Sequence, residues 1–98
     1  MKIRNVGGIN PELCRCGNWL NHWKNFSGQK IPYYCPVIGC GKSKLSATFV
    51  QIVSGVDSGW YVVPLCEEHS KTENEILEID DYCKIVTANV NMTCELYK

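Results

Sequence analysis

Two close pairs of potential metal ligands, one on each side of an apolar segment, constrain this chain more than any other feature. Cys35 and Cys40 form the first pair, and Cys66 and His69 form the second. Between the pairs, the β-branched segments 45–53 and 60–63 are separated by a run of turn-forming residues. This pattern predicts a β-hairpin, which places the two ligand pairs at the same end of the hairpin.

The two pairs together supply the ligand set of a structural zinc site. Zn²⁺ in such sites is held by four thiolate or imidazole groups in a tetrahedron, so we predict one zinc ion bound by Cys35, Cys40, Cys66 and His69. A cysteine pair, a hairpin and a second pair at a helix start describe a treble-clef zinc domain, and the predicted fold class is α+β. The alternative is that Cys35 or Cys66 is simply a small buried apolar residue.

The length of the chain indicates a single small domain. With 98 residues, it lies near the lower limit for a core that is stable without further support, and its seven cysteines offer that support. We predict a lead-in with a short aromatic helix over 1–34, the zinc hairpin–helix core over 35–79, and a C-terminal strand and tail over 80–98.

The helix in the lead-in is predicted over 18–26. Trp19, Trp23 and Phe26 recur at helical spacing on one face, and Gly28 is a helix stop. This aromatic face is interpreted as packing on the zinc hairpin. Residues 1–13 are predicted to be irregular, because Gly and Pro punctuate them.

Two further elements are predicted after His69. Thr72 and Glu75 fit a capping box, which predicts a helix of about two turns running through Ile76, Leu77 and Ile79. The apolar segment 82–87 predicts a last strand.

The cysteine count and the hydropathy pattern predict a cytoplasmic protein without a membrane span. The number of cysteines is odd and no signal peptide is visible, which favours reduced thiols over a disulfide scaffold. The longest apolar run, 60–66, is far too short to cross a bilayer.

The charges are balanced overall but divided unevenly along the chain. Residues 1–50 carry seven basic groups and one acidic group, whereas residues 51–98 carry three basic and nine acidic groups. If the basic groups share one face, that face could bind phosphate or an acidic partner. The candidate binding surface in this half consists of Arg15, Trp19, Trp23, Lys24, Lys30, Lys42 and Lys44.

The segment from Cys40 to His69 resembles the zinc-bearing core of the HNH (ββα-metal) nucleases. The resemblance is carried mainly by Tyr61-Val-Val-Pro-Leu-Cys66-Glu-Glu-His69. The chain is also similar, over most of its length, to a group of small bacterial and phage-type zinc proteins. That second likeness is carried by the ranges 14–23, 35–40, 87–89 and 93–94, and it implies no activity.

The catalytic part of the nuclease resemblance is missing. HNH nucleases use a histidine on the first hairpin strand to activate water, and the similar small proteins carry a histidine there. This chain has Thr48, and a threonine is no general base at neutral pH. The only histidine near the hairpin, His69, is assigned to zinc, and His22 is remote in sequence.

The remaining thiols leave a second metal site open. Cys14, Cys16 and His22 are its candidate ligands, although the Cys14–Cys16 spacing is tighter than the usual zinc pair. In the alternative reading, Cys83 and His22 are packing residues. Redox and cysteine-protease chemistry are disfavoured, because there is no Cys-x-x-Cys motif and the chain contains only two histidines.

These observations predict a non-catalytic, zinc-stabilised binding module. A protein partner is favoured, as for an accessory or inhibitory factor, because a net charge of zero gives no overall attraction to a polyanion. Two alternatives remain: nucleic-acid binding through the basic, aromatic first half, and a degenerate metal-dependent nuclease.

Overall fold

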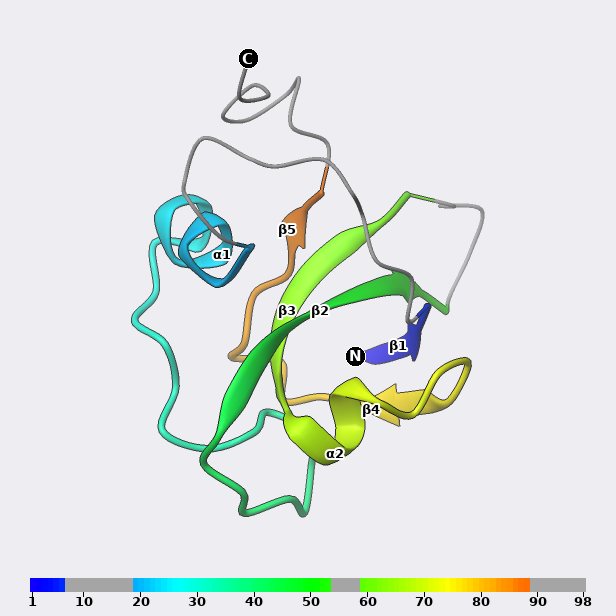
Figure 1. Ribbon diagram of the computed structural model, residues 1–98. Helices are drawn as coiled ribbons and strands as arrows, with labels where there is room; N and C mark the ends of the chain where they lie inside the picture. The colour runs from blue at the N-terminus through cyan, green and yellow to red at the C-terminus, as the bar shows by residue number, and fades with distance from the viewer. Residues whose placement is uncertain (7–18, 54–58, 89–98) are drawn as a thin grey trace.

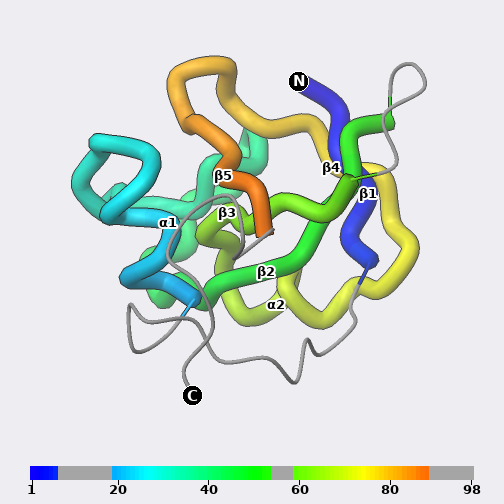
Figure 2. Tube along the Cα trace, turned by 90° about the horizontal axis from the view of Figure 1, so that it is seen from above, coloured from blue at the N-terminus to red at the C-terminus, as the bar shows by residue number. Residues whose placement is uncertain are grey.

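The computed structural model describes residues 1–6, 19–53 and 59–88, which form an antiparallel sheet with two helices (Figures 1 and 2). The order of the strands across the sheet is β4-β1-β2-β3-β5. The elements are β1 (Lys2–Asn5), α1 (Trp19–Ser27), β2 (Leu45–Ile52), β3 (Tyr61–Cys66), α2 (Glu67–Ser70), β4 (Ile76–Glu78) and β5 (Val86–Thr87). The α+β class predicted from the sequence is confirmed.

The predicted hairpin is the centre of the sheet. β2 and β3 pair from Leu45 opposite Cys66 to Val50 opposite Tyr61. β3 is longer than the predicted segment 60–63 and runs directly into α2. This register places Cys66 opposite Leu45, the first residue of β2. Because Cys40 precedes Leu45 by only a few residues, Cys40 and Cys66 lie at the same end of the hairpin.

Helix α1 is also confirmed, and it packs on β2, β3 and β5 (Figure 1). The indole of Trp23 is 1 % exposed and donates a hydrogen bond from Nε1 to the carbonyl of Lys84 at 2.7 Å. Phe26 is 45 % exposed, so the third aromatic residue of the predicted core face lies largely outside the core. The helix ends before Gly28, whose φ of 72° lies in the left-handed region that favours glycine.

The prediction that the chain begins with an irregular segment was wrong. Residues Lys2–Asn5 form β1, which lies between β2 and β4, and its side chains alternate between exposed and buried. Ile3 is fully buried, opposite Ile52 on one side and Leu77 on the other. Four residues are too few for this alternation to stand out in the sequence.

The predicted helix after His69 was wrong as well. The helix is the single turn α2, and Ile76–Glu78 is strand β4. Asn74 has a φ of 66°, which no continuous helix tolerates, and its N–H donates to the carbonyl of Asn5 at 2.6 Å. Pairing with β1 therefore prevails over the local capping signal.

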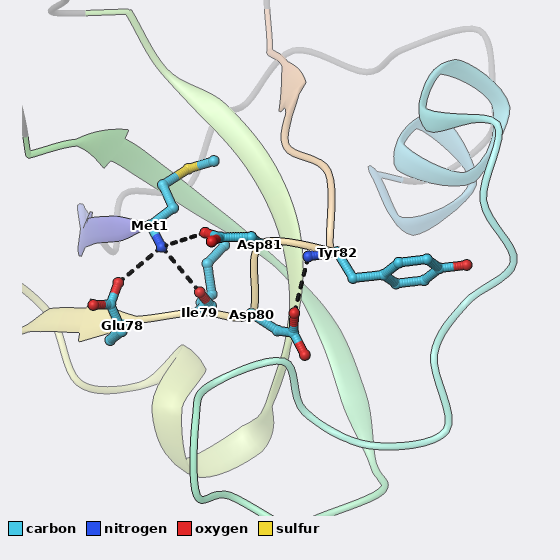
Figure 3. Close-up of polar contacts among 6 residues, drawn as sticks. All are labelled: Met1, Glu78, Ile79, Asp80, Asp81 and Tyr82. Carbon is cyan, nitrogen blue, oxygen red and sulfur yellow. Dashed lines mark hydrogen bonds and ion pairs between the residues drawn. The ribbon is translucent and has the colours of Figure 1, made fainter.

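The last predicted strand is shorter than expected, because a turn occupies its first half. The N–H of Tyr82 donates to the Asp80 carboxylate at 2.9 Å, and the N–H of Cys83 donates to the carbonyl of Asp80 at 3.0 Å. Only Val86–Thr87 pairs with β3. Figure 3 shows the turn beside the amino group of Met1, which contacts the carboxylates of Glu78 at 2.8 Å and Asp81 at 2.9 Å.

Candidate metal centre

The four residues predicted to bind zinc converge on one point. The ligand atoms of Cys35, Cys40, Cys66 and His69 all lie within 4.8 Å of one another. Cys66 Sγ is 3.2 Å from His69 Nδ1 and 3.8 Å from Cys40 Sγ, and Cys35 Sγ is 3.7 Å from His69 Nδ1. Among the residues in the described ranges, this is the only such cluster.

These separations fit a tetrahedral metal site. With metal–sulfur bonds of about 2.3 Å and metal–nitrogen bonds of about 2.0–2.1 Å, a tetrahedron has edges of roughly 3.8 Å between sulfurs and 3.6 Å between sulfur and nitrogen. The observed 3.8 and 3.7 Å lie near these values, the 3.2 Å contact is shorter, and all pairs of ligand atoms lie within 4.8 Å. The arrangement can therefore hold a metal ion with four protein ligands, which would leave no open coordination position for chemistry.

The first pair is set by a tight loop, residues 35–40, which we call the cysteine knuckle. The N–H of Cys40 donates to the carbonyl of Val37 at 3.0 Å, and the N–H of Cys35 donates to the carbonyl of Lys42 at 2.8 Å. Gly39 closes the loop with a φ of 86°, a conformation that strains other residues. The loop therefore turns both thiols to the same side.

The second pair is set by the junction of β3 and α2. Cys66 is the last residue of the strand and the N-cap of the helix, and its Sγ accepts a hydrogen bond from the N–H of His69 at 3.5 Å. At the other end of α2, Asn5 Nδ2 donates to the carbonyls of His69 at 2.8 Å and Ser70 at 3.1 Å. Asn5 thus ties β1 to the helix that carries His69, a role that the sequence did not reveal.

The electrostatics of the cluster favour a bound cation. Burial is the largest effect on Cys35, and it raises the pKa of this thiol to about 11, although the backbone N–H groups of Cys66 and Val37 stabilise the thiolate. Three thiolates at these separations would repel one another, whereas a divalent metal ion deprotonates the thiols it binds and offsets their charge.

The other thiol in the described part of the chain does not join the cluster. Cys83 is 6 % exposed, and burial, followed by the negative charges of Asp80 and Cys35, raises its pKa to about 11. Cys83 therefore occupies the core, as in the packing interpretation of this residue.

The second predicted metal site lies mostly outside the described residues. Cys14 and Cys16 fall in the range 7–18, so this site stays a prediction. His22, in α1, is fully buried, and its Nε2 lies 2.9 Å from the carbonyl oxygen of Thr87. The centroid of its ring lies 4.9 Å from that of Trp19 and 5.0 Å from that of Phe26. These contacts are those of a packing histidine.

Thr48, the residue that the resemblance places where HNH nucleases carry their catalytic histidine, is buried. Thr48 is 3 % exposed, and its hydroxyl donates to the hydroxyl of Ser70 in α2 at 2.9 Å. Its side chain therefore connects the first hairpin strand to α2.

The structure removes one residue from the candidate binding surface. Trp23 belongs to the core, which corrects its assignment to that surface. Trp19 is partly buried and meets Phe49 edge to face at 5.1 Å. Lys42 forms an ion pair with Glu68. The side chains of Lys24, Lys30 and Lys44 are exposed, and Arg15 lies outside the described residues.

Comparisons with protein-family models, curated proteins and solved structures found no match for this chain. Within the described ranges, no helix is long and apolar enough to cross a membrane.

Proposed function

We propose that this protein is a treble-clef zinc domain of HNH-like type that acts as a non-catalytic binding module for another protein. The observation that carries the proposal is the convergence of three thiols and one imidazole between the cysteine knuckle and the start of α2. The sequence of knuckle, hairpin and ligand-bearing helix is the order of a treble clef. Sulfur-rich tetrahedral sites favour Zn²⁺ over the harder divalent ions, and the free thiols fit a reducing cytoplasm.

Metal substitution tests the zinc assignment. Co²⁺ bound in place of zinc should give the absorption bands of a tetrahedral thiolate site, and one equivalent of Zn²⁺ should abolish them. Cys83→Ala, which changes a thiol outside the cluster, should leave the spectrum unchanged. A spectrum of an octahedral oxygen site would contradict the assignment.

The lack of an enzymatic role is supported by the hairpin. Thr48 stands where the resemblance places the catalytic histidine, and its hydroxyl is buried against Ser70. We expect no cleavage of plasmid DNA by the zinc-loaded chain with Mg²⁺, Mn²⁺ or Ni²⁺. Metal-dependent cleavage that survives further purification would instead support the degenerate-nuclease alternative.

A protein partner is supported over a nucleic acid by the distribution of charge. Trp23 cannot stack on a base from within the core, and Lys42 is already paired with Glu68. Lys24, Lys30 and Lys44 remain exposed, but the net charge of zero gives no overall attraction to phosphates. We expect no salt-sensitive binding of single-stranded or duplex DNA or RNA at low ionic strength, and tight binding that falls steeply with salt would reverse this choice.

A further inference from the structure

The large apolar side chains that face solvent gather around the cysteine knuckle. Tyr33 is 88 % exposed, Tyr82 82 %, Ile38 65 % and Tyr34 62 %, and these are the four most exposed large apolar residues in the described part of the chain. An isolated exposed apolar residue needs no explanation, but a contiguous group of them marks an interaction surface.

These four residues line one groove. The groove has a volume of about 510 Å³, and its walls are the segment 32–40 on one side and Asp80, Tyr82 and Cys83 on the other. We call it the knuckle groove. Tyr33 and Tyr82 also border a neighbouring groove of about 460 Å³ that extends towards Trp23 and Gln29. The two grooves share Pro32, Tyr33, Tyr82 and Cys83.

The charge of the knuckle groove is negative. Among the described residues that line it, Asp80 is the only charged one. Asp81 follows Asp80 in the chain and Glu78 lies two residues before it, but both pair with the amino group of Met1 on the side away from Tyr82 and do not line the groove (Figure 3). The Asp80 carboxylate accepts one hydrogen bond, from the N–H of Tyr82, and retains capacity for more.

The walls of the groove are held in place by the backbone and by the metal ligands. The N–H of Ile38 donates to the carbonyl of Glu78 at 2.9 Å, and the N–H of Asp80 donates to the carbonyl of Pro36 at 2.8 Å. Across the second groove, Gln29 Nε2 donates to the carbonyl of Tyr82 at 2.8 Å. Cys35 and Cys40 belong to both the groove wall and the metal cluster, so the shape of the groove depends on that cluster.

We infer that the knuckle groove binds an arginine or lysine side chain in an extended segment of a partner protein. A cation is attracted to the faces of aromatic rings, and the carboxylate of Asp80 provides the opposite charge. An arginine guanidinium can satisfy both at once, because it stacks on rings and donates in the plane to a carboxylate. This inference rests on the proposed function, since it specifies the partner chemistry of that binding module.

Other occupants fit the groove less well. A nucleic acid could stack its bases on the tyrosines, but its phosphates would meet the carboxylate of Asp80. An uncharged proline-rich segment could pack on the same rings, but it would bury Asp80 without a charged partner.

The test is fluorescence anisotropy with the full zinc-loaded chain and a labelled peptide of arginine, glycine and serine. We expect saturable binding that weakens as salt rises. Tyr33→Ala and Tyr82→Ala should each weaken the affinity for the peptide by roughly 2- to 5-fold. Tyr33→Phe keeps the ring and should bind the peptide like the unchanged chain. Asp80→Asn should weaken binding and reduce its dependence on salt.

The matched control is Ile76→Ala, which removes a side chain that is 50 % exposed and outside the groove, and it should bind like the unchanged chain. Three results would each overturn the inference. A peptide with glutamine in place of arginine could bind as tightly as the arginine peptide, an uncharged proline-rich peptide could do so, or the chain could prefer a labelled oligodeoxythymidylate. The absence of arginine-peptide binding by a zinc-containing, folded chain would also overturn it, while leaving the zinc domain and its lack of nuclease activity intact.

Discussion

Two regions of the molecule are held together in different ways. One is the metal-centre half, made of the cysteine knuckle and α2, and the other is the paired strands β1 and β4, which we call the β1–β4 half. Around the metal centre, the cysteine knuckle and α2 meet through four ligand side chains, and the backbone of both is mostly loop or a single helical turn. In the other half, β1 and β4 have no such ligands. They depend on strand pairing and on the burial of Ile3, Leu77 and Ile79, each at most 5 % exposed.

This difference indicates which half would depend on a bound metal ion for its order. A single turn of helix and a cysteine loop bury too little apolar surface to be ordered on their own. The β1–β4 half buries apolar side chains but has one short strand of three residues at its edge. Asn5 links the two halves through its hydrogen bonds to the end of α2. Single substitutions in each half separate the two contributions to stability.

Cys66→Ser should leave most of the chain unfolded, because it replaces a thiolate ligand by a hydroxyl while keeping an N-cap acceptor for α2. Structural zinc supplies on the order of 10–16 kcal/mol of apparent binding free energy in small domains. Circular dichroism and thermal unfolding measure the loss. The control is Cys83→Ala, which should keep both fold and zinc, and an unchanged melting temperature for Cys66→Ser would remove the metal centre from the account.

Ile3→Ala should destabilise the β1–β4 half without removing the metal. Ile3 is fully buried between Ile52 and Leu77, and the resulting cavity should lower the free energy of unfolding by about 2–5 kcal/mol. Denaturant unfolding with parallel zinc analysis measures both properties. The conservative control Ile3→Val should cost about 0.5–1.5 kcal/mol. Loss of zinc from folded Ile3→Ala would show that the two halves are not separable.

Asn5→Ala should weaken the connection between the halves. The carbonyls of His69 and Ser70 would each lose a buried donor, which should lower the free energy of unfolding by about 1–3 kcal/mol. Because one of these carbonyls belongs to a ligand residue, zinc affinity should fall as well. Competition with a chromogenic chelator measures that affinity, and an affinity equal to that of the unchanged chain would restrict Asn5 to a role in folding.

Lys42→Ala should have the smallest effect, although Lys42 lies beside the metal centre. Its ion pair with Glu68 joins side chains that are 59 % and 60 % exposed, and such surface pairs contribute about 0–1 kcal/mol. Lys44→Ala, at a neighbouring exposed lysine, is the matched control in the same denaturant titration. A difference above 2 kcal/mol between the two variants would mean that Lys42 supports the knuckle directly.

The sequence predicted the metal-centre half well and the other half poorly, for a physical reason. Ligand pairs such as Cys35–Cys40 and Cys66–His69 are close in sequence, and the apolar hairpin between them is continuous, so short-range patterns contain the information. The pairing of β1 with β4 joins residues more than seventy positions apart. No local pattern records it, and the capping box at Thr72–Glu75 pointed to a helix that this pairing excludes.

The groove beside the knuckle was missed for a related reason. Tyr33 and Tyr34 precede the first ligand pair, and Tyr82 follows β4. Long-range backbone contacts bring these segments together: the bridge between Val37 and Ile79, and the hydrogen bond from Asp80 N–H to the carbonyl of Pro36. The sequence instead drew attention to Trp23, which the structure buries in the core.

The most direct test of the central claim is native mass spectrometry with metal analysis, on chain purified without added metal, before and after chelation. The account predicts one zinc per chain at the Cys35, Cys40, Cys66 and His69 cluster, with loss of the folded charge-state distribution as the metal is removed. A second zinc would place the Cys14, Cys16 and His22 site alongside the first. A chain that contains no metal and keeps its fold after chelation would contradict the claim that this cluster organises the domain.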